Sequence, residues 1–234
     1  METLLKELSD KIEVNLTEEQ ISKFITYKEL LKDWNQKINL TAITEDSEIV
    51  LKHFVDSLTV LKYISQNADM IDVGTGAGFP GIPTKIARED VSVTLLDSLN
   101  KRINFLNDVI EKTNLENIKT VHGRAEDFGQ NKEYRERYDI AVARAVANLS
   151  TLTELCLPFV KVGGSFIAMK GNSTEEFEEA KKAIETLGGK IEKIDRFNLP
   201  GTDIERNIVV IKKINKTSNQ YPRKAGTPAN KPIK

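Results

Sequence analysis

Cysteine and histidine are nearly absent from this chain of 234 residues, which has one Cys and two His. Disulfide frameworks and Cys/His zinc clusters need several such residues, so both are excluded and no metal site is expected. Long apolar runs are also missing, whereas a membrane helix needs about 20 such residues. The charged N-terminus METLLKELSDKIEV lacks the apolar core of a signal peptide. We therefore expect a soluble, cytoplasmic monomer without a membrane partner.

The net charge of −1 hides an uneven distribution. Seven basic and no acidic residues lie between Asn207 and Lys234, which leaves 27 basic and 35 acidic residues in positions 1–206. Basic tails on acidic bodies often contact phosphate-rich partners, although a solvated tail that serves solubility has the same composition. After Lys213 the chain is rich in Asn, Thr, Ser, Pro and Lys, which favours a flexible basic tail over residues 214–234.

Two regions precede this tail. Residues 1–65 have the pattern of helices, with a capping box at Thr17 and Gln20 and a second helix expected over residues 45–63. We interpret them as a helical extension packed on a main domain of residues 66–213. In that domain, short β-rich runs alternate with helical stretches, which predicts an α/β, doubly wound, mostly parallel sheet. The expected strands cover residues 70–73, 91–96, 118–121, 138–143, 165–169 and 207–211, and the expected helices cover 81–88, 100–113, 150–158 and 174–187.

The segment IDVGTGAGFPG, residues 71–81, lies between the first expected strand and its helix. Its glycines, Gly74, Gly76 and Gly78 among them, allow a tight turn and close approach to a ligand. They also satisfy the G-x-G-x-x-G spacing of dinucleotide sites, a weak motif by itself. Asp72 in D-V-G-x-G-x-G instead resembles the first motif of class I methyltransferases, which bind S-adenosylmethionine. A tight turn without a ligand is the remaining alternative.

Two acidic positions further along support a nucleoside cofactor. Asp97 ends the second expected strand, where a carboxylate can accept hydrogen bonds from both ribose hydroxyls. This position suits NAD and S-adenosylmethionine alike. Glu126 follows the third expected strand, where class I methyltransferases commonly contact the adenine. A helix N-terminus or a surface turn is the competing interpretation.

Other absences narrow the methyl acceptor. The chain has no N-P-P-[YF] motif of exocyclic-amine methylation, and Cys156 lacks the Pro-Cys context of cytosine-C5 enzymes. The remaining kind of methyl acceptor is an atom that can attack without first losing a proton. Guanine N7 is such an atom, because it carries a lone pair and no proton. An enzyme for this reaction can work by positioning, without a general base.

Five longer motifs follow one another along the chain. They are WNQKINLT at 34–41, HFVDSL at 53–58, GFPGIP at 78–83, RAVA at 144–147 and PRKAGTP at 222–228. In order and over nearly the whole chain, they resemble the bacterial glucose-inhibited division protein B family, the small-subunit rRNA guanine-N7 methyltransferases. The resemblance implies a class I fold with an N-terminal helical extension. It also implies methyl transfer to one guanine near the decoding region of 16S rRNA, in the RNA, the small subunit or its precursor.

The resemblance also implies site residues. The cofactor positions are Gly74, Phe79, Ala125, Glu126 and Arg144, which join Asp72, Gly76, Gly78 and Asp97 from the arguments above. The catalytic and substrate positions are His53, Arg124, Arg144 and Arg206, with Lys52 beside them and Arg223 and Lys224 in the acid-free terminus as further RNA contacts. Lys52 stands where many members carry Arg, so the charge is kept but bidentate phosphate recognition is lost.

The basic residues have structural alternatives. Arg144 ends an apolar strand, and ligands of open α/β sheets lie beyond the carboxyl ends of strands, so a site role is favoured over a structural ion pair. Arg206 can simply pair with Asp203 or Glu205, and His53 can be a helix-surface or core-edge residue.

Two other functions stay open. An NAD-dependent oxidoreductase would use the same glycines, but no Tyr-x-x-x-Lys pair stands in a plausible place. The other open function is a noncatalytic RNA-binding protein that senses S-adenosylmethionine. The sequence does not exclude it, because a guanine-N7 enzyme needs no diagnostic base.

Overall fold

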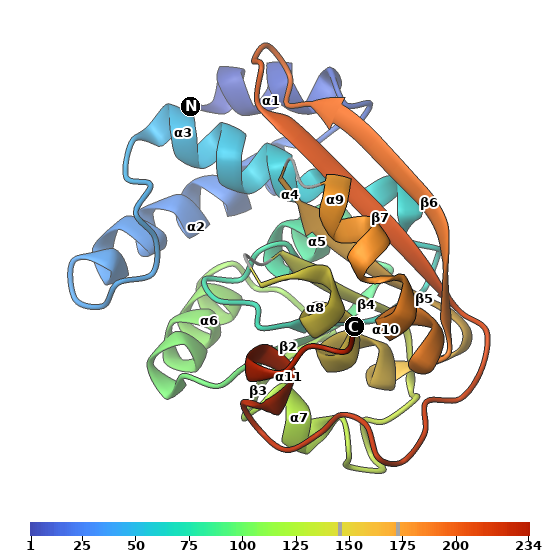
Figure 1. The fold of residues 1–234 in the computed structure, drawn as a ribbon. Coiled ribbons are helices and arrows are strands. Elements are labelled where there is room, and N and C mark those ends of the chain that lie inside the picture. Colours follow the sequence, from blue (N-terminus) through green and yellow to red (C-terminus); the bar gives the residue numbers. More distant parts are fainter. Residues whose placement is uncertain (145–146, 172–173) are drawn as a thin grey trace.

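The computed structural model describes residues 1–144, 147–171 and 174–234, which form an α/β fold around one sheet (Figure 1). Within these residues, seven strands lie in the order β3-β2-β1-β4-β5-β7-β6. They are β1 (Asp69–Val73), β2 (Ser92–Asp97), β3 (Ile118–His122), β4 (Tyr138–Arg144), β5 (Val160–Lys170), β6 (Gly189–Asn198) and β7 (Glu205–Lys213). Strands β1 to β5 pair in parallel, whereas β7 is antiparallel to β5 and β6. The strand order reverses between β1 and β4, which is where open α/β sheets bind ligands.

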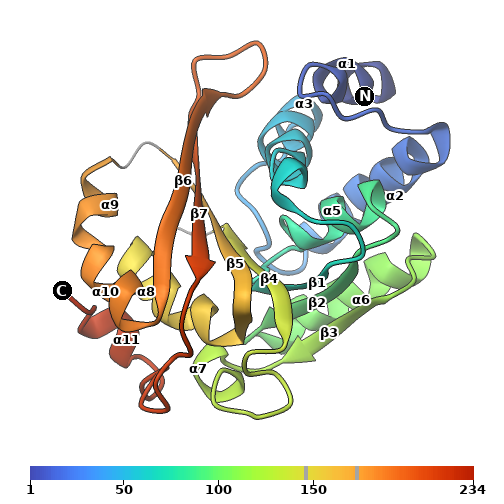
Figure 2. The same cartoon turned by 90° about the vertical axis from the view of Figure 1, so that its right-hand side faces the viewer.

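Helices cover both faces of the sheet (Figure 2). The first core is shared by α1 (Glu2–Asp10), α2 (Glu18–Asn35), α3 (Asp46–Ile49), α5 (Gly81–Ala87) and α6 (Asn100–Lys112). The second core, on the other face, is shared by α8 (Leu149–Cys156), α9 (Thr174–Glu179) and α10 (Lys181–Thr186). In the part of the chain that the structure describes, no helix is both long and apolar enough to cross a membrane.

The helix expected over residues 45–63 forms, but it is not uniform. After α3, Val50–Val55 is a π-helical segment, followed by α4 (Asp56–Leu58) and a 3₁₀ turn at Leu61–Tyr63. π-Helical turns are rare and recur at functional sites. Here the segment and α4 carry His53 and Asp56, which are 9% and 3% exposed.

All six predicted strands form, with β5 beginning earlier, at Val160. Strand β6 was missed in the sequence. It is an edge strand that pairs with β7 alone among the described strands, and five of its ten residues are charged. A polar edge strand of this kind lacks the apolar run that reveals a central strand.

The prediction of a flexible tail is wrong. Residues 214–234 pack on the domain, and Figure 1 shows them passing α7 (Ala125–Phe128) and ending against α8. Arg135 donates hydrogen bonds of 2.7–3.1 Å to three carbonyl oxygens of this segment. Arg223 forms an ion pair with Glu154 on α8, and α11 (Thr227–Asn230) also contacts α8. Bonds from side chains to backbone carbonyls leave no mark in composition, which is why the order of this segment was not predicted.

Candidate active site

Asp72 shapes the loop that follows β1. Its Oδ2 accepts hydrogen bonds from the Thr75 hydroxyl at 2.7 Å and from the Gly81 amide at 2.8 Å, so one carboxylate joins the two ends of the loop. Complete burial raises the pKa of Asp72 to about 6. Its Oδ1 is buried and has no hydrogen-bond partner among the described residues. The contacts of Asp72 are therefore with the loop itself.

Gly74 and Gly76 present an open surface on this loop. Their φ angles are 71° and 62°, the left-handed region that glycine adopts readily. A Cβ added at Gly74 would meet nothing within 4 Å, and one at Gly76 would meet only the Gly74 carbonyl oxygen, at 4.0 Å. Gly78 differs, because a Cβ there would lie 2.7 Å from Ile82 and 2.8 Å from the Tyr27 hydroxyl. Gly78 thus lets the loop pack on α2, whereas Gly74 and Gly76 leave room for a ligand.

Asp97 borders the same loop from the end of β2. Its Oδ2 accepts a hydrogen bond from the Gly76 amide at 2.9 Å, and its Oδ1 accepts one from the Leu99 amide at 2.9 Å. Arg102 Nη1 lies 3.3 Å from Oδ2. Only 2% of Asp97 is exposed, so a nearly buried carboxylate stands beside the open glycines. A carboxylate in this position can accept hydrogen bonds from the hydroxyl groups of a nucleoside.

Arg144 lies in a polar cluster at the end of β4. Its Nη1 donates to Asp56 Oδ2 at 3.2 Å and to the Lys52 carbonyl at 3.0 Å, and its Nη2 donates to His53 Nδ1 at 3.1 Å. Arg206 Nε donates to the other carboxylate oxygen, Asp56 Oδ1, at 3.0 Å. One nearly buried carboxylate therefore balances two guanidinium groups, and Arg206 pairs with neither of the acids expected from the sequence.

Phe79 joins the glycine loop to this cluster. The His53 ring stacks on it with 4.4 Å between centroids and 15° between planes, and Arg144 Cζ lies 4.7 Å from its centroid. Burial, together with the charge of Arg144, lowers the pKa of His53 to about 3. His53 is therefore neutral at pH 7. Since Nδ1 accepts from Arg144, Nε2 carries the proton and donates to Thr41 Oγ1 at 2.8 Å.

The cluster opens into a hollow of about 410 Å³. Its lining residues are Ile43, Lys52, His53, Asp56, Arg144, Met169, Lys170, Gly171 and Arg206. Asp56 and Lys170 were not among the predicted site residues. Asp56 stands in the HFVDSL motif together with His53. That motif was the one signal in the sequence that could have pointed to Asp56. A larger hollow, of about 690 Å³, lies by Lys11–Val14 and Phe197–Pro200, and no predicted site residue lines it.

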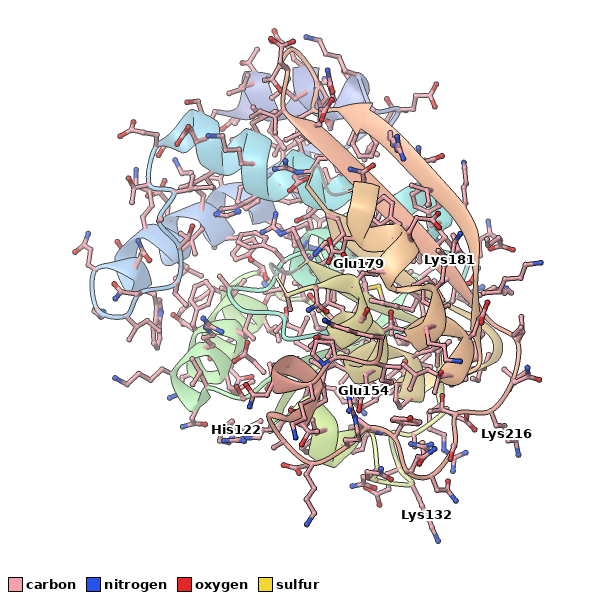
Figure 3. All side chains as sticks on the ribbon, in the orientation of Figure 1. His122, Lys132, Glu154, Glu179, Lys181 and Lys216 are labelled. Atoms are coloured by element: carbon pink, nitrogen blue, oxygen red, sulfur yellow. The ribbon has the colours of Figure 1, made fainter. Side chains whose placement is uncertain are left out.

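Other predicted residues lie outside the cluster. Arg124 is exposed at the start of α7, and β2 and β1 separate its strand from β4. The neighbouring His122 points away from the body of the protein (Figure 3). Ala125 and Glu126 begin α7, and Glu126 Oε1 accepts a hydrogen bond from the Gly226 amide at 2.9 Å.

Three further predicted positions complete the comparison. Lys52 pairs with Glu48 at 2.5 Å beside the hollow, and Lys224 is exposed. Arg223 is held by Glu154, so its guanidinium is engaged within the protein. Ala145 and Val146 of the RAVA motif lie outside the described residues.

The architecture is shared with solved methyltransferase structures. A S-adenosylmethionine-dependent methyltransferase from Aquifex aeolicus superposes with a TM-score of 0.54 at 18% identity, covering 78% of this chain and 98% of that chain. At this identity the likeness concerns the fold alone. It shows that this chain has the fold of class I methyltransferases, as predicted, with a glycine loop at the switch point of the sheet.

Sequence comparison identifies the family. The GidB family model, described as rRNA small subunit methyltransferase G, matches residues 20–209. Proteins named ribosomal RNA small subunit methyltransferase G from Acetivibrio thermocellus and Clostridium perfringens are 61% and 55% identical to this chain. The alignments cover 98% and 99% of this chain and 96% and 98% of theirs. The chain belongs to this family, and the resemblance found in its motifs is confirmed.

S-adenosylmethionine is accordingly the cofactor, and the residues present fit it. The surface above Gly74 and Gly76 is open where side chains would otherwise stand, and the nearly buried Asp97 carboxylate borders it. Both groups lie at the carboxyl edge of the sheet, beside the cluster around Arg144.

Proposed function

We propose that this chain transfers a methyl group from S-adenosylmethionine to N7 of a guanine in the decoding region of 16S rRNA. The observation that carries the proposal is the position of Phe79, whose ring contacts both His53 and Arg144 while its backbone belongs to the glycine loop. Family membership supports the choice of rRNA as substrate.

The cofactor side of the site consists of three strand ends. We assign Gly74, Gly76 and Phe79 after β1, Asp97 at the end of β2, and Ala125 and Glu126 after β3 to the binding of S-adenosylmethionine. Asp72 acts through the loop, whose two ends it holds together. The bound cofactor supplies a methyl group on a positively charged sulfur, and transfer leaves that charge on the guanine ring.

His53 supports this reaction without acting as a base. Guanine N7 has a lone pair and no hydrogen, so its attack needs no general base. His53 has no free ring nitrogen, because Nδ1 accepts from Arg144 and Nε2 donates to Thr41. Its role in the proposal is to fix the guanidinium of Arg144 over the Phe79 ring.

Arg144 and Arg206 occupy the substrate side. Guanidinium groups donate in a planar fork that suits guanine O6 and phosphate oxygens. Asp56 offsets part of their positive charge, which matters because the methylated guanine is itself a cation. Lys52 and Lys170 line the same hollow, where Lys52 pairs with Glu48 and the nearly buried Lys170 pairs with Glu176.

Transfer of a labelled methyl group tests the proposal. The purified chain is incubated with labelled S-adenosylmethionine and, in parallel, free 16S rRNA, a precursor particle and the mature small subunit. We expect label in one 7-methylguanine, identified by mass spectrometry of nuclease digests. In a strain that lacks the gene, that modification should be missing from 16S rRNA. Label in another base, or persistence of every 7-methylguanine in that strain, would contradict the assignment.

A further inference from the structure

The helix that carries Ala125 and Glu126, α7, is a single turn. Within it, the Phe128 amide donates to the Arg124 carbonyl at 3.1 Å and the Gly129 amide donates to the Ala125 carbonyl at 2.8 Å. One turn closed by so few bonds is marginal alone and depends on its surroundings for a fixed position.

Those surroundings include residues 217–230, which we call the strap. The Gly226 amide donates to Glu126 Oε1 at 2.9 Å, and Gln130 Nε2 donates to the carbonyls of Pro222 at 2.9 Å and Asn219 at 3.1 Å. A Cβ at Gly129 would lie 2.8 Å from the Pro222 ring, so strap and turn are in close contact. Three polar contacts thus join the strap to the turn that follows β3.

The strap is fastened elsewhere by Arg223. Its Nη2 donates to Glu154 Oε2 at 2.5 Å, and its Nε and backbone amide each donate to Oε1 at 2.8 Å. Only 1% of the Glu154 side chain is exposed, and Figure 3 shows it on α8 where the C-terminal segment crosses. These bonds raise the pKa of Arg223, which stays charged and paired. A bidentate pair on a buried carboxylate is a strong and directional anchor.

We propose that Arg223 is a positioning residue for the cofactor: by clamping the strap to Glu154, it holds the Ala125–Glu126 turn in place for S-adenosylmethionine. The inference rests on the proposed assignment of Ala125 and Glu126 to cofactor binding. It gives Arg223 a different task from the RNA contact expected of a basic terminus. A turn that is already ordered loses less conformational entropy when the ligand binds, so the strap strengthens binding without touching the ligand.

The test compares two neighbouring cations in the full-length chain. Arg223→Gln removes the anchor, whereas Lys224→Gln removes the same charge from an exposed side chain. By calorimetric titration, we expect Arg223→Gln to raise the Kd for S-adenosylmethionine about tenfold, equivalent to one or two ordering contacts. Its kcat at saturating cofactor should stay within about twofold of wild type, since the arginine cluster is intact. Lys224→Gln should leave the Kd unchanged, and Arg223→Lys should restore part of the affinity.

Arg223→Gln also leaves Glu154 buried without its counter-charge, so a second variant separates folding from positioning. Gln130→Ala removes two bonds to the strap and no charge. We expect it to raise the Kd about three- to tenfold with an unfolding temperature close to that of wild type. An unchanged Kd in Gln130→Ala would overturn the proposal, whatever the stability of Arg223→Gln.

A parallel measurement separates the strap from RNA binding. If Arg223→Gln and Lys224→Gln both weaken binding of 16S rRNA while the Kd for S-adenosylmethionine stays at the wild-type value, the strap is an RNA-binding element and the proposal is wrong. Cofactor titration uses no RNA. A failure of the proposed methyl transfer would therefore appear in the methylation assay and would not be mistaken for a failure here.

Discussion

Arg206 Nε donates to Asp56 Oδ1 at 3.0 Å, although 150 positions separate the two residues in the chain. Strand β7 makes this contact possible. Because β7 runs antiparallel to β5, its first residues lie at the edge of the sheet where β4 and β5 end. Arg206, near the start of β7, and Arg144, at the end of β4, therefore both pair with the carboxylate of Asp56 on α4.

Replacing Asp56 tests whether its pairing with Arg144 and Arg206 matters for methylation. In Asp56→Asn the shape is kept but two guanidinium groups lose their counter-charge, so we expect Arg144 and Arg206 to move apart. We expect kcat for rRNA methylation to fall about 10- to 100-fold, since small misplacements of positioning groups have effects of this size. The Kd for S-adenosylmethionine should change little. Asp195→Asn, which breaks the pairs of Asp195 with Lys62 and Lys193, is the control and should retain kcat. Equal kcat values for both variants would contradict the role of Asp56.

Alanine substitutions at Gly76 and Gly201, which have similar backbone angles, distinguish the effect of backbone strain from the effect of blocking the ligand. Gly76 and Gly201 have φ angles of 62° and 74°, and no side chain lies within 4 Å of a Cβ built on either. Alanine at each position should destabilise the fold by about 1 kcal/mol through the left-handed conformation. Only Gly76→Ala should raise the Kd for S-adenosylmethionine, by about tenfold or more, because its methyl group enters the ligand surface. Neither variant nor wild type should bind NAD. Calorimetry checks both ligands, and loss of cofactor affinity in Gly201→Ala would point to a global effect instead.

His53 should make the fold sensitive to acid. Its pKa is about 3 in the folded protein and 6.5 for an unperturbed side chain. Between these values the unfolded chain binds more protons, so its population is favoured and the free energy of unfolding falls as the pH decreases from 6.5 towards 3. In His53→Gln this contribution is gone. Urea denaturation at pH 7 and pH 4.5 should therefore show a smaller loss of stability for His53→Gln than for wild type, and equal losses would refute the buried neutral histidine.

Salt dependence can locate the RNA on the carboxyl edge of the sheet. Arg124 and Arg137 are both exposed, but Arg124 follows the end of β3 whereas Arg137 precedes the start of β4. If RNA lies along the carboxyl edge, Arg124→Gln should lower the slope of log affinity against log salt by about 0.7 for one lost phosphate contact on a single strand. Arg137→Gln should leave the slope unchanged. Filter binding at several salt concentrations measures both, and the opposite pattern would place the RNA at the other edge.

Much of the fold could be predicted because the central strands are short apolar runs. Strands such as β1 and β2 are buried on both faces, and their neighbours in sequence are helices, so the doubly wound pattern is visible without a structure. Strand β6 was not predicted, because its exposed charged residues interrupt any such apolar run. The π-helical segment Val50–Val55 has no pattern that distinguishes it from an α-helix in the sequence.

The positions of some candidate site residues in the fold could be predicted for a similar reason. Asp72, Gly74 and Asp97 stand at fixed offsets from strands and can be located by counting. The partners of Arg144 and Arg206 cannot be found in this way, because Asp56 reaches them only after the N-terminal helices and β7 have docked on the sheet. The contacts of Arg223 depend likewise on the path of the chain after β7, which composition does not encode.

The distance along the chain between Asp56 and Arg206 has a consequence for synthesis. Translation delivers the N-terminal helices and β1 to β5 first, and these can begin to pack as they emerge from the ribosome. The paired arginines cannot assemble until β7 has been made and has inserted beside β5. A nascent chain therefore lacks the complete cluster of Asp56, Arg144 and Arg206 until nearly all of it has been translated. If the cluster binds rRNA as proposed, the chain cannot methylate rRNA before its own synthesis is almost finished.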